Sequence, residues 1–213
     1  MKILICVPSM DQVAAGFAQS LATLNKVGEC AISFVCGSLV YDARNKLSRQ
    51  ALEFGADYTV WFDSDMIFEP DTLKKLIEHL ENDDCDVISG IYFRRAAPFT
   101  PVLFKELEVT DTGCTWKDFN DYPKDSLFDV AGIGFGCCAM KTEILLAMSV
   151  KDKDFFSPIN GVGEDLSFCW RARNLGYKIK CDSSIKCGHV GLMTVTEPLF
   201  LANQEAMKDE SQN

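Results

Sequence analysis

The sequence predicts an α/β fold built on a parallel sheet. Short apolar runs rich in β-branched and aromatic residues alternate with amphipathic segments through the first half of the chain. This alternation requires crossover connections, which are right-handed between parallel strands. The length of 213 residues suits one such domain with a substantial core.

The elements of the first half follow one another regularly. Strands are predicted at residues 2–7, 31–36, Tyr58–Phe62 and 86–89. Helices are predicted between them at residues 12–26 and 42–54, and from Pro70 onward. The third helix has proline at a favoured first position and an apolar stripe formed by Leu73, Leu76, Ile77 and Leu80.

The pattern breaks after Gly90. Residues 91–135 are predicted to be irregular, with short strand-like pieces at 102–104 and 127–130, and such long segments inside a domain are usually functional. A strand at 135–140, helices at 142–148 and 164–175, and closing strands at 177–181 and 185–187 are predicted to follow. We therefore expect one domain over residues 1–196, with 91–135 as an insertion, and a polar tail at 197–213.

Composition narrows the class of partner and the compartment. The formal net charge of −10 argues against nucleic acid or an anionic membrane surface as the main partner. No apolar stretch approaches the roughly 18 residues of a membrane span, and the N-terminal run reaches Pro8 too early for a signal peptide. The ten cysteines show no Cys-x-x-Cys spacing, which indicates reduced, buried thiols and a cytoplasmic protein.

Two carboxylates follow the third predicted strand directly. Asp63-Ser64-Asp65 comes after Tyr58–Phe62, at the end of the strand where open α/β sheets bind ligands. Oxygen donors on one turn suit a hard divalent cation, which in turn suits a phosphate-bearing substrate. Two solvated acids in a strand-to-helix loop are the alternative.

A second acidic pair opens a helix. Glu164 and Asp165 follow Gly161 and Gly163. Acids in a first helical turn are favoured by the helix dipole and need no further function. The glycines, however, let a backbone approach a ligand closely, and a carboxylate in such a cleft can act as a general base toward a hydroxyl group.

The histidines and arginines offer further candidates. His189 follows a strand-like segment, and imidazole is a common ligand in manganese-type sites, although most single histidines have no such role. His79 is expected to face solvent. Arg44 can pair with a phosphate or a base carbonyl, or form a surface salt bridge. Arg94-Arg95 is the other positive pair in reach of this sheet edge, and a solvated loop is its alternative.

One glycine-rich segment is not expected to bind a dinucleotide. In Gly132-Ile133-Gly134-Phe135-Gly136, Cys137 stands where the fingerprint needs its last glycine, and no helix follows at once. The chain also lacks the Gly-x-x-x-x-Gly-Lys phosphate loop. Nicotinamide-dependent and P-loop enzymes are therefore not expected.

Several of these motifs occur in one order over residues 1–190. They are Val7-Pro8, Ala43-Arg44-Asn45, Trp61 to Asp65, Gly163-Glu164-Asp165, and residues 168–178 with Trp170-Arg171 and Gly176-Tyr177. Taken together they resemble the GT-A fold glycosyltransferases, and within them the large family 2 group. The resemblance implies a Rossmann-like, mostly parallel sheet flanked by helices.

The resemblance implies roles for the acidic residues and the histidine. Asp65, assisted by Asp63, would bind Mn²⁺ or Mg²⁺ at the diphosphate of a nucleoside-diphosphate sugar, and His189 would complete the coordination. Asp165 would be the catalytic base toward the acceptor hydroxyl, and Glu164 would contact the acceptor.

The resemblance also implies a nucleotide pocket. Val7 and Pro8 would line it, with Arg44 and Asn45 nearby and Ser64 among the residues that bind the donor. Family 2 members usually carry an acid near the end of the second strand, where this chain has Val35-Cys36-Gly37-Ser38, so the identity of the nucleotide stays open.

The expected activity is metal-dependent transfer of a sugar, of the hexosyl type, to a carbohydrate or other hydroxyl acceptor, with inversion. Polysaccharide assembly is the expected setting, and residues 91–135 would lie on the acceptor side. A haloacid dehalogenase-like phosphatase, which also carries Asp-x-Asp after a strand, is one alternative. A non-catalytic GT-A domain that binds sugar nucleotides is another, and a homo-oligomer stays open.

Overall fold

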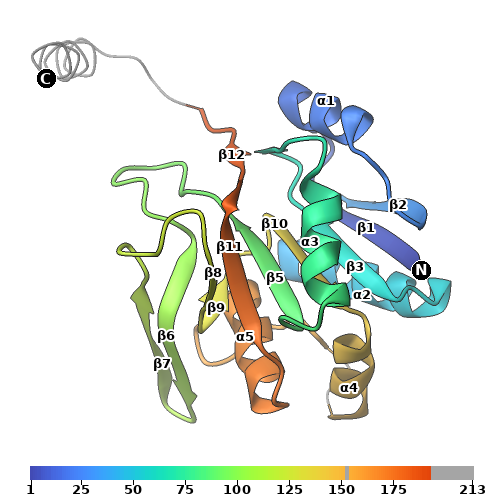
Figure 1. The fold of residues 1–213 in the computed structure, drawn as a ribbon. Coiled ribbons are helices and arrows are strands. Elements are labelled where there is room, and N and C mark those ends of the chain that lie inside the picture. The colour runs from blue at the N-terminus through green and yellow to red at the C-terminus, as the bar shows by residue number, and fades with distance from the viewer. Residues whose placement is uncertain (152–153, 193–213) are drawn as a thin grey trace, which may run out of the picture.

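The computed structural model describes residues 1–151 and 154–192, and a seven-stranded sheet forms its centre (Figure 1). In spatial order the strands are β2 (Glu29–Cys36), β1 (Lys2–Ser9), β3 (Tyr58–Phe62), β10 (Cys137–Lys141), β5 (Val87–Ile91), β11 (Ile179–Lys186) and β8 (Leu127–Asp129). Only β10 and β8 run antiparallel to the strands they pair with in this sheet. The predicted α/β fold with a mostly parallel sheet is therefore confirmed.

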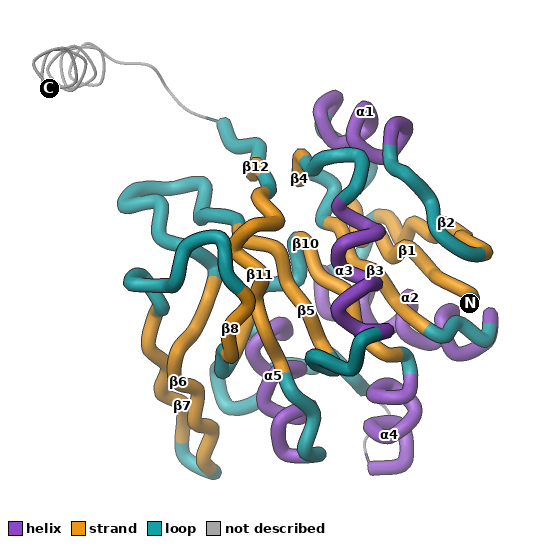
Figure 2. Tube along the Cα trace, viewed as in Figure 1, coloured by secondary structure: helices purple, strands orange, loops and turns teal. Residues whose placement is uncertain are grey.

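Helices cover both faces of the sheet (Figure 2). α1 (Ala15–Thr23) and α3 (Thr72–Glu81) contribute to the apolar core on one face. α2 (Val40–Phe54), α4 (Glu143–Lys151) and α5 (Glu164–Asn174) contribute to the core on the other. Successive residues of β1 enter alternate cores, Ile3 and Ile5 on one side and Leu4 and Cys6 on the other. Burial on both faces explains the continuous apolar runs from which the strands were predicted.

The segment 91–135 is more regular than predicted. β6 (Leu103–Thr110) and β7 (Gly113–Asp118) form an antiparallel hairpin, and β9 (Gly132–Ile133) extends it to a three-stranded sheet. The hairpin has a signal in the sequence, because apolar and polar residues alternate on both sides of Asp111-Thr112. The prediction of irregular structure was wrong at this hairpin.

Other boundaries also differ from the prediction. The two predicted closing strands are one strand, β11, with a register shift between Asp182 and Lys186. β10 lies between β3 and β5, two parallel strands that follow each other in the first half of the chain. The predicted domain boundary at residue 196 and the tail 197–213 lie outside the described residues. Over the residues described, no helix has the length and apolar character to cross a bilayer.

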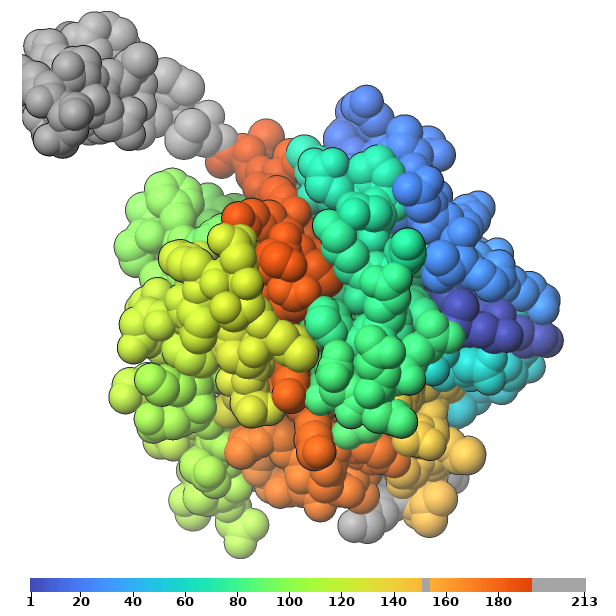
Figure 3. Space-filling view, viewed as in Figure 1, coloured from blue at the N-terminus to red at the C-terminus, as the bar shows by residue number. Residues whose placement is uncertain are grey.

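His79 does not face solvent as predicted. It is half-buried at the end of α3, with Nδ1 3.0 Å from Asp84 Oδ2 and Nε2 3.0 Å from Asp182 Oδ2. Asp182 belongs to β11, which lies between α3 and the 91–135 segment in the space-filling view (Figure 3). His79 therefore ties α3 to β11. The sequence pattern of α3 could not show this, because Asp182 is distant in the chain.

Candidate active site

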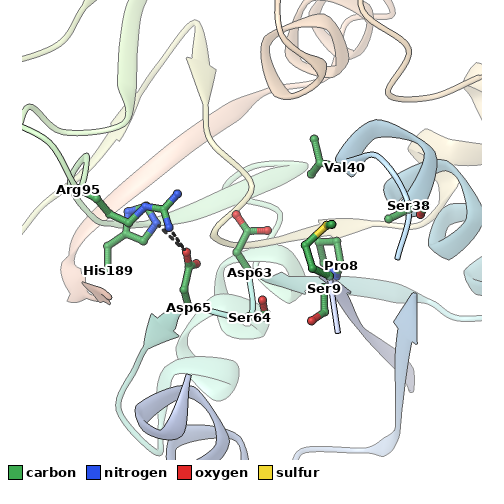
Figure 4. Close-up of a pocket in the computed structure, with 11 residues that line it drawn as sticks. Pro8, Ser9, Ser38, Val40, Asp63, Ser64, Asp65, Arg95 and His189 are labelled. Carbon is green, nitrogen blue, oxygen red and sulfur yellow. Dashed lines mark hydrogen bonds and ion pairs between the residues drawn. The ribbon is translucent and has the colours of Figure 1, made fainter. Parts of the chain in front are cut away.

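A cavity of about 390 Å³ opens at the carboxyl ends of β1 and β3 (Figure 4). Its walls come from five segments of the chain: Pro8, Ser9 and Met10; Ser38, Val40 and Ala43; Asp63, Ser64 and Asp65; Arg95; and His189. Because parallel strands end at one edge of a sheet, the loops after β1, β2 and β3 meet there. The cavity lies where the sequence predicted a ligand.

Backbone hydrogen bonds fix the Asp-Ser-Asp turn. Asp63 N donates to Gly136 O at 3.0 Å, and Met66 N donates to Asp63 O at 3.1 Å. The chain then enters β4 (Met66–Ile67), which pairs antiparallel with β12 (Gly188–His189). Val190 N also donates to Asp65 O at 2.8 Å. This small sheet, absent from the prediction, brings His189 beside Asp65.

Asp65 has two cationic or potentially cationic neighbours. Arg95 Nη1 lies 2.7 Å from Asp65 Oδ2, and His189 Nε2 lies 3.5 Å from the same oxygen. His189 Nδ1 is 2.8 Å from the Phe93 carbonyl oxygen, which accepts only an N–H, so Nε2 is the atom presented to Asp65. Burial opposes ionisation of Asp65, but the contacts to His189 and Arg95 outweigh it and lower its pKa.

Asp65 and His189 form a donor pair that fits a divalent cation. Carboxylate oxygen and imidazole nitrogen both suit Mn²⁺, and the Nδ1–H bond to a backbone carbonyl is the usual way of orienting a metal-binding histidine. Cations in such sites take their remaining ligands from substrate phosphates and water. Among the described residues, no three His, Cys, Asp or Glu side chains converge on one point, so Asp63 does not join this pair here.

Asp63 instead pairs with Arg44. The guanidinium of Arg44 is buried, with Nη2 3.0 Å from Asp63 Oδ1 and Nε 3.5 Å from Glu164 Oε1. Its Cζ lies 5.5 Å from the ring centre of Phe135, in cation–π contact. Burial raises the pKa of Asp63, and the positive charge of Arg44 works against that rise. Arg44 therefore joins the two acidic motifs from within the core.

The second acidic motif opens α5. Asp165 is half-buried, and its Oδ1 accepts a hydrogen bond from Leu166 N at 2.7 Å. Burial, together with the negative charge of Glu164, raises the pKa of Asp165 to about 6. A carboxylate with a pKa near neutrality is well matched to general base catalysis at physiological pH.

The predicted nucleotide-binding residues do not all reach the cavity. Pro8 and Ser64 line it. Val7 is fully buried within β1. Asn45 is also buried, and its Oδ1 accepts hydrogen bonds from Phe155 N and Phe156 N, both at 2.9 Å. The side chains of Val7 and Asn45 are therefore engaged in the core. The resemblance implied that Val7 lines the pocket and that Asn45 lies near it, and both roles stay predictions.

Several residues of the cavity wall, among them Met10 and Ser38, had no role predicted from the sequence. Met10 and Ser38 lie in the loops after β1 and β2. Ser38 Oγ is buried, and no hydrogen-bond partner is found for it among the described residues. Both positions could have been found from the rule that ligands bind beyond the carboxyl ends of the strands. Neither residue type suggested a function by itself.

The glycine-rich segment serves packing. A Cβ on Gly134 would overlap the hydroxyl of Tyr92, and a Cβ on Gly136 would lie 2.8 Å from Tyr92 Cζ. Tyr92 is buried, and its Oη accepts a hydrogen bond from Gly136 N at 3.0 Å. The glycines thus make room for Tyr92 beneath the site, which accounts for them without a bound dinucleotide.

Comparisons with known proteins identify a family and agree with the fold. Residues 39–146 match the family model described as glycosyl transferase family 2, a range that includes Arg44 and Asp63 to Asp65 but ends before Asp165 and His189. Among solved structures, A197 from STIV is similar in fold, with a TM-score of 0.66 and 23% sequence identity over 90% of this chain and 87% of that chain. No curated protein matches the chain.

Proposed function

Because the chain belongs to glycosyl transferase family 2, we propose that it moves a sugar from a nucleoside-diphosphate donor to a hydroxyl acceptor. The proposed transfer uses a divalent cation and inverts the configuration at the anomeric carbon. The observation that carries this proposal is the bridge formed by Arg44, which contacts Asp63 and Glu164 at once. It holds the acidic turn after β3 and the acidic start of α5 at one edge of the sheet. That the sugar is a hexose and that the acceptor belongs to polysaccharide assembly are predictions from the family resemblance alone.

The proposed reaction is a single displacement. The acceptor hydroxyl attacks the anomeric carbon, Asp165 takes the hydroxyl proton, and the bond to the diphosphate oxygen breaks with its electrons leaving on that oxygen. A carboxylate with a pKa of about 6 is ionised at neutral pH and can accept this proton. A cation held by Asp65 and His189 would neutralise the charge on the departing diphosphate.

The cavity wall supports a place for the nucleoside. Pro8, Met10 and Val40 supply apolar surface on which a base can pack. Ser38 Oγ, buried and unpartnered among the described residues, can hydrogen-bond a ribose hydroxyl in place of the acid that family members usually carry. Asp65 and Arg95, at the other end of the same cavity, are suited to the diphosphate and its cation.

Thermal stabilisation tests the donor site. The protein is heated with UDP, GDP, CDP or TDP, each with and without Mn²⁺, because a ligand that binds only the folded state raises its stability. We expect one nucleotide to raise the melting temperature, to require Mn²⁺, and to lose its effect in Asp65→Ala. Ser38→Ala should weaken the same response without changing its dependence on Mn²⁺.

Product analysis separates the alternatives. A non-catalytic sugar-nucleotide-binding domain would give the Mn²⁺-dependent shift but would neither transfer nor hydrolyse the sugar of the matching donor. A phosphatase would give no shift with any of the four nucleotides and would release phosphate from simple esters. Family membership argues against the phosphatase, so turnover of the donor sugar is the decisive second measurement.

A further inference from the structure

Arg95 occupies the oxygen that the proposed cation needs. Its Nη1 lies 2.7 Å from Asp65 Oδ2, the same oxygen that faces His189 Nε2 at 3.5 Å (Figure 4). A cation shared by Asp65 and His189 would take this oxygen and His189 Nε2 as ligands. A guanidinium and a divalent ion repel each other, so Arg95 and the cation would compete for this oxygen.

The stem of Arg95 is packed, whereas its charged head is exposed and held by Asp65. A Cβ added to Gly191 would lie 3.0 Å from Arg95 Cβ and 3.3 Å from its Cγ, so the aliphatic stem packs on the Gly191 backbone. The side chain is nevertheless 53% exposed. A stem held by packing and an exposed charged head allow the guanidinium to turn while the loop stays in place.

Two cavities adjoin Arg95. Arg95 and His189 line the 390 Å³ cavity and also a second cavity of about 310 Å³, whose other walls include Phe93, Phe99 and Leu192. The guanidinium can therefore leave Asp65 without leaving the site. The diphosphate of a bound donor would be the strongest anion within its reach.

The neighbouring arginine has a different role. Arg94 Nη2 lies 3.0 Å from Asp118 Oδ1 in β7, and its Cζ lies 6.0 Å from the ring centre of Phe104. Arg94 thus ties the loop after β5 to the hairpin. It has the same charge and a similar exposure, 44%, which makes it a matched control.

We propose that Arg95 is a positioning residue that keeps Asp65 paired until the donor arrives and then exchanges Asp65 for the donor diphosphate. The inference rests on the proposed function, because it takes Asp65 as a ligand of the cation. The exchange of partners by Arg95 has a thermodynamic consequence. The cation alone must displace Arg95 and binds weakly, whereas the nucleotide gives Arg95 a new partner, so that cation and nucleotide bind cooperatively.

Mn²⁺ binding without nucleotide tests this exchange. The free ion is followed by electron paramagnetic resonance in titrations of the wild type, Arg95→Gln and Arg94→Gln, after thermal unfolding has confirmed that each is folded. We expect Arg95→Gln to bind Mn²⁺ alone about tenfold more tightly than the wild type, because a positive charge has been removed from the site. Arg94→Gln should match the wild type. With the matching nucleoside diphosphate present, Arg95→Gln should lose most of the cooperative gain.

The outcomes distinguish this inference from the proposed function. If Arg95→Gln binds Mn²⁺ alone no more tightly than the wild type, while the wild type binds Mn²⁺ with a nucleotide, the role of Arg95 is overturned and the donor site stands. If Arg94→Gln gains the same affinity for Mn²⁺, the effect comes from the charge of the protein in general and not from the contact with Asp65. This result would also overturn the role of Arg95. If no protein binds Mn²⁺ with any of the four nucleotides, both proposals fail.

Discussion

We expect Asp165 to set the pH dependence of the proposed transfer. Its pKa of about 6 lies above the usual value of 3.8, mainly because of burial and secondly because of Glu164. Only the ionised carboxylate accepts a proton, so kcat/KM should fall about tenfold per pH unit below pH 6 and level off above it. A pH profile between 4.5 and 8.5 measures this. A flat profile across pH 6 would remove Asp165 from the role of base.

Asp165→Asn should separate chemistry from binding. We expect transfer to fall by about 10³-fold or more, while Mn²⁺-dependent nucleotide binding stays close to the wild type. The sign of the stability change provides a second readout. A carboxyl whose pKa is raised by folding stabilises the protein at low pH and loses that contribution as pH rises through the folded pKa. The melting temperature of the asparagine variant relative to the wild type should therefore be higher at pH 7.5 than at pH 4.5.

At the scale of the elements, His79 joins α3 to β11. Burial works against its charged form, but the hydrogen bonds to Asp182 and Asp84 outweigh burial and raise the pKa of His79 above its usual 6.5. Both ring nitrogens face carboxylate oxygens at 3.0 Å, which only the doubly protonated ring can satisfy. The clamp is therefore strongest when the ring is charged.

The stabilisation from His79 should decrease as pH rises. A histidine whose pKa is raised by folding contributes fully below pH 6.5 and loses that contribution as pH rises through its folded pKa. We expect His79→Gln to lower the free energy of unfolding by about 1 kcal/mol at pH 5.5 and by less at pH 8.5. Urea unfolding at both pH values measures the two differences. Equal differences at both would show that His79 acts through packing and not through charge.

The elements also show how far sequence reasoning reaches. Strands such as Tyr58–Phe62 were predictable because burial on both faces leaves a continuous apolar run. The position of β10 between β3 and β5 was not, because strand order depends on contacts between segments distant in the chain. β4 and β12 have two residues each, which is too short for any periodic pattern.

The candidate site also combines features that are visible in the sequence with features that depend on folding. Asp63, Asp65 and Asp165 became candidates because acids next to predicted strand or helix ends are visible in a sequence. The bridge from Arg44 to Asp63 and Glu164, and the contact of Arg95 with Asp65, depend on where long side chains point after folding. Periodicity does not record those directions. The side chain of Asn45 turns inward toward residues 155 and 156, and the sequence could not predict this for the same reason.

At the scale of the whole molecule, the cavity is built from both ends of the described chain. Pro8 comes from β1, whereas His189 comes from β12 and is held against Asp65 by its pairing with β4. A ligand that contacts Asp65 and His189 together would resist separation of these two short strands. Donor binding should therefore stabilise the end of the described chain as well as the loops after β1 to β3.

Hydrogen exchange measures that coupling. The Val190 amide donates to Asp65 O at 2.8 Å and exchanges only when β12 separates from β4. If separation requires the donor to leave, Mn²⁺ with the matching nucleotide at 100 times its Kd should slow exchange in residues 186–191 by up to about 100-fold. The turn between β6 and β7, at residues 110–113, serves as a remote control and should not change. Protection of residues 8–10 and 38–40 without protection of 186–191 would show that the nucleotide binds while His189 takes no part in holding it.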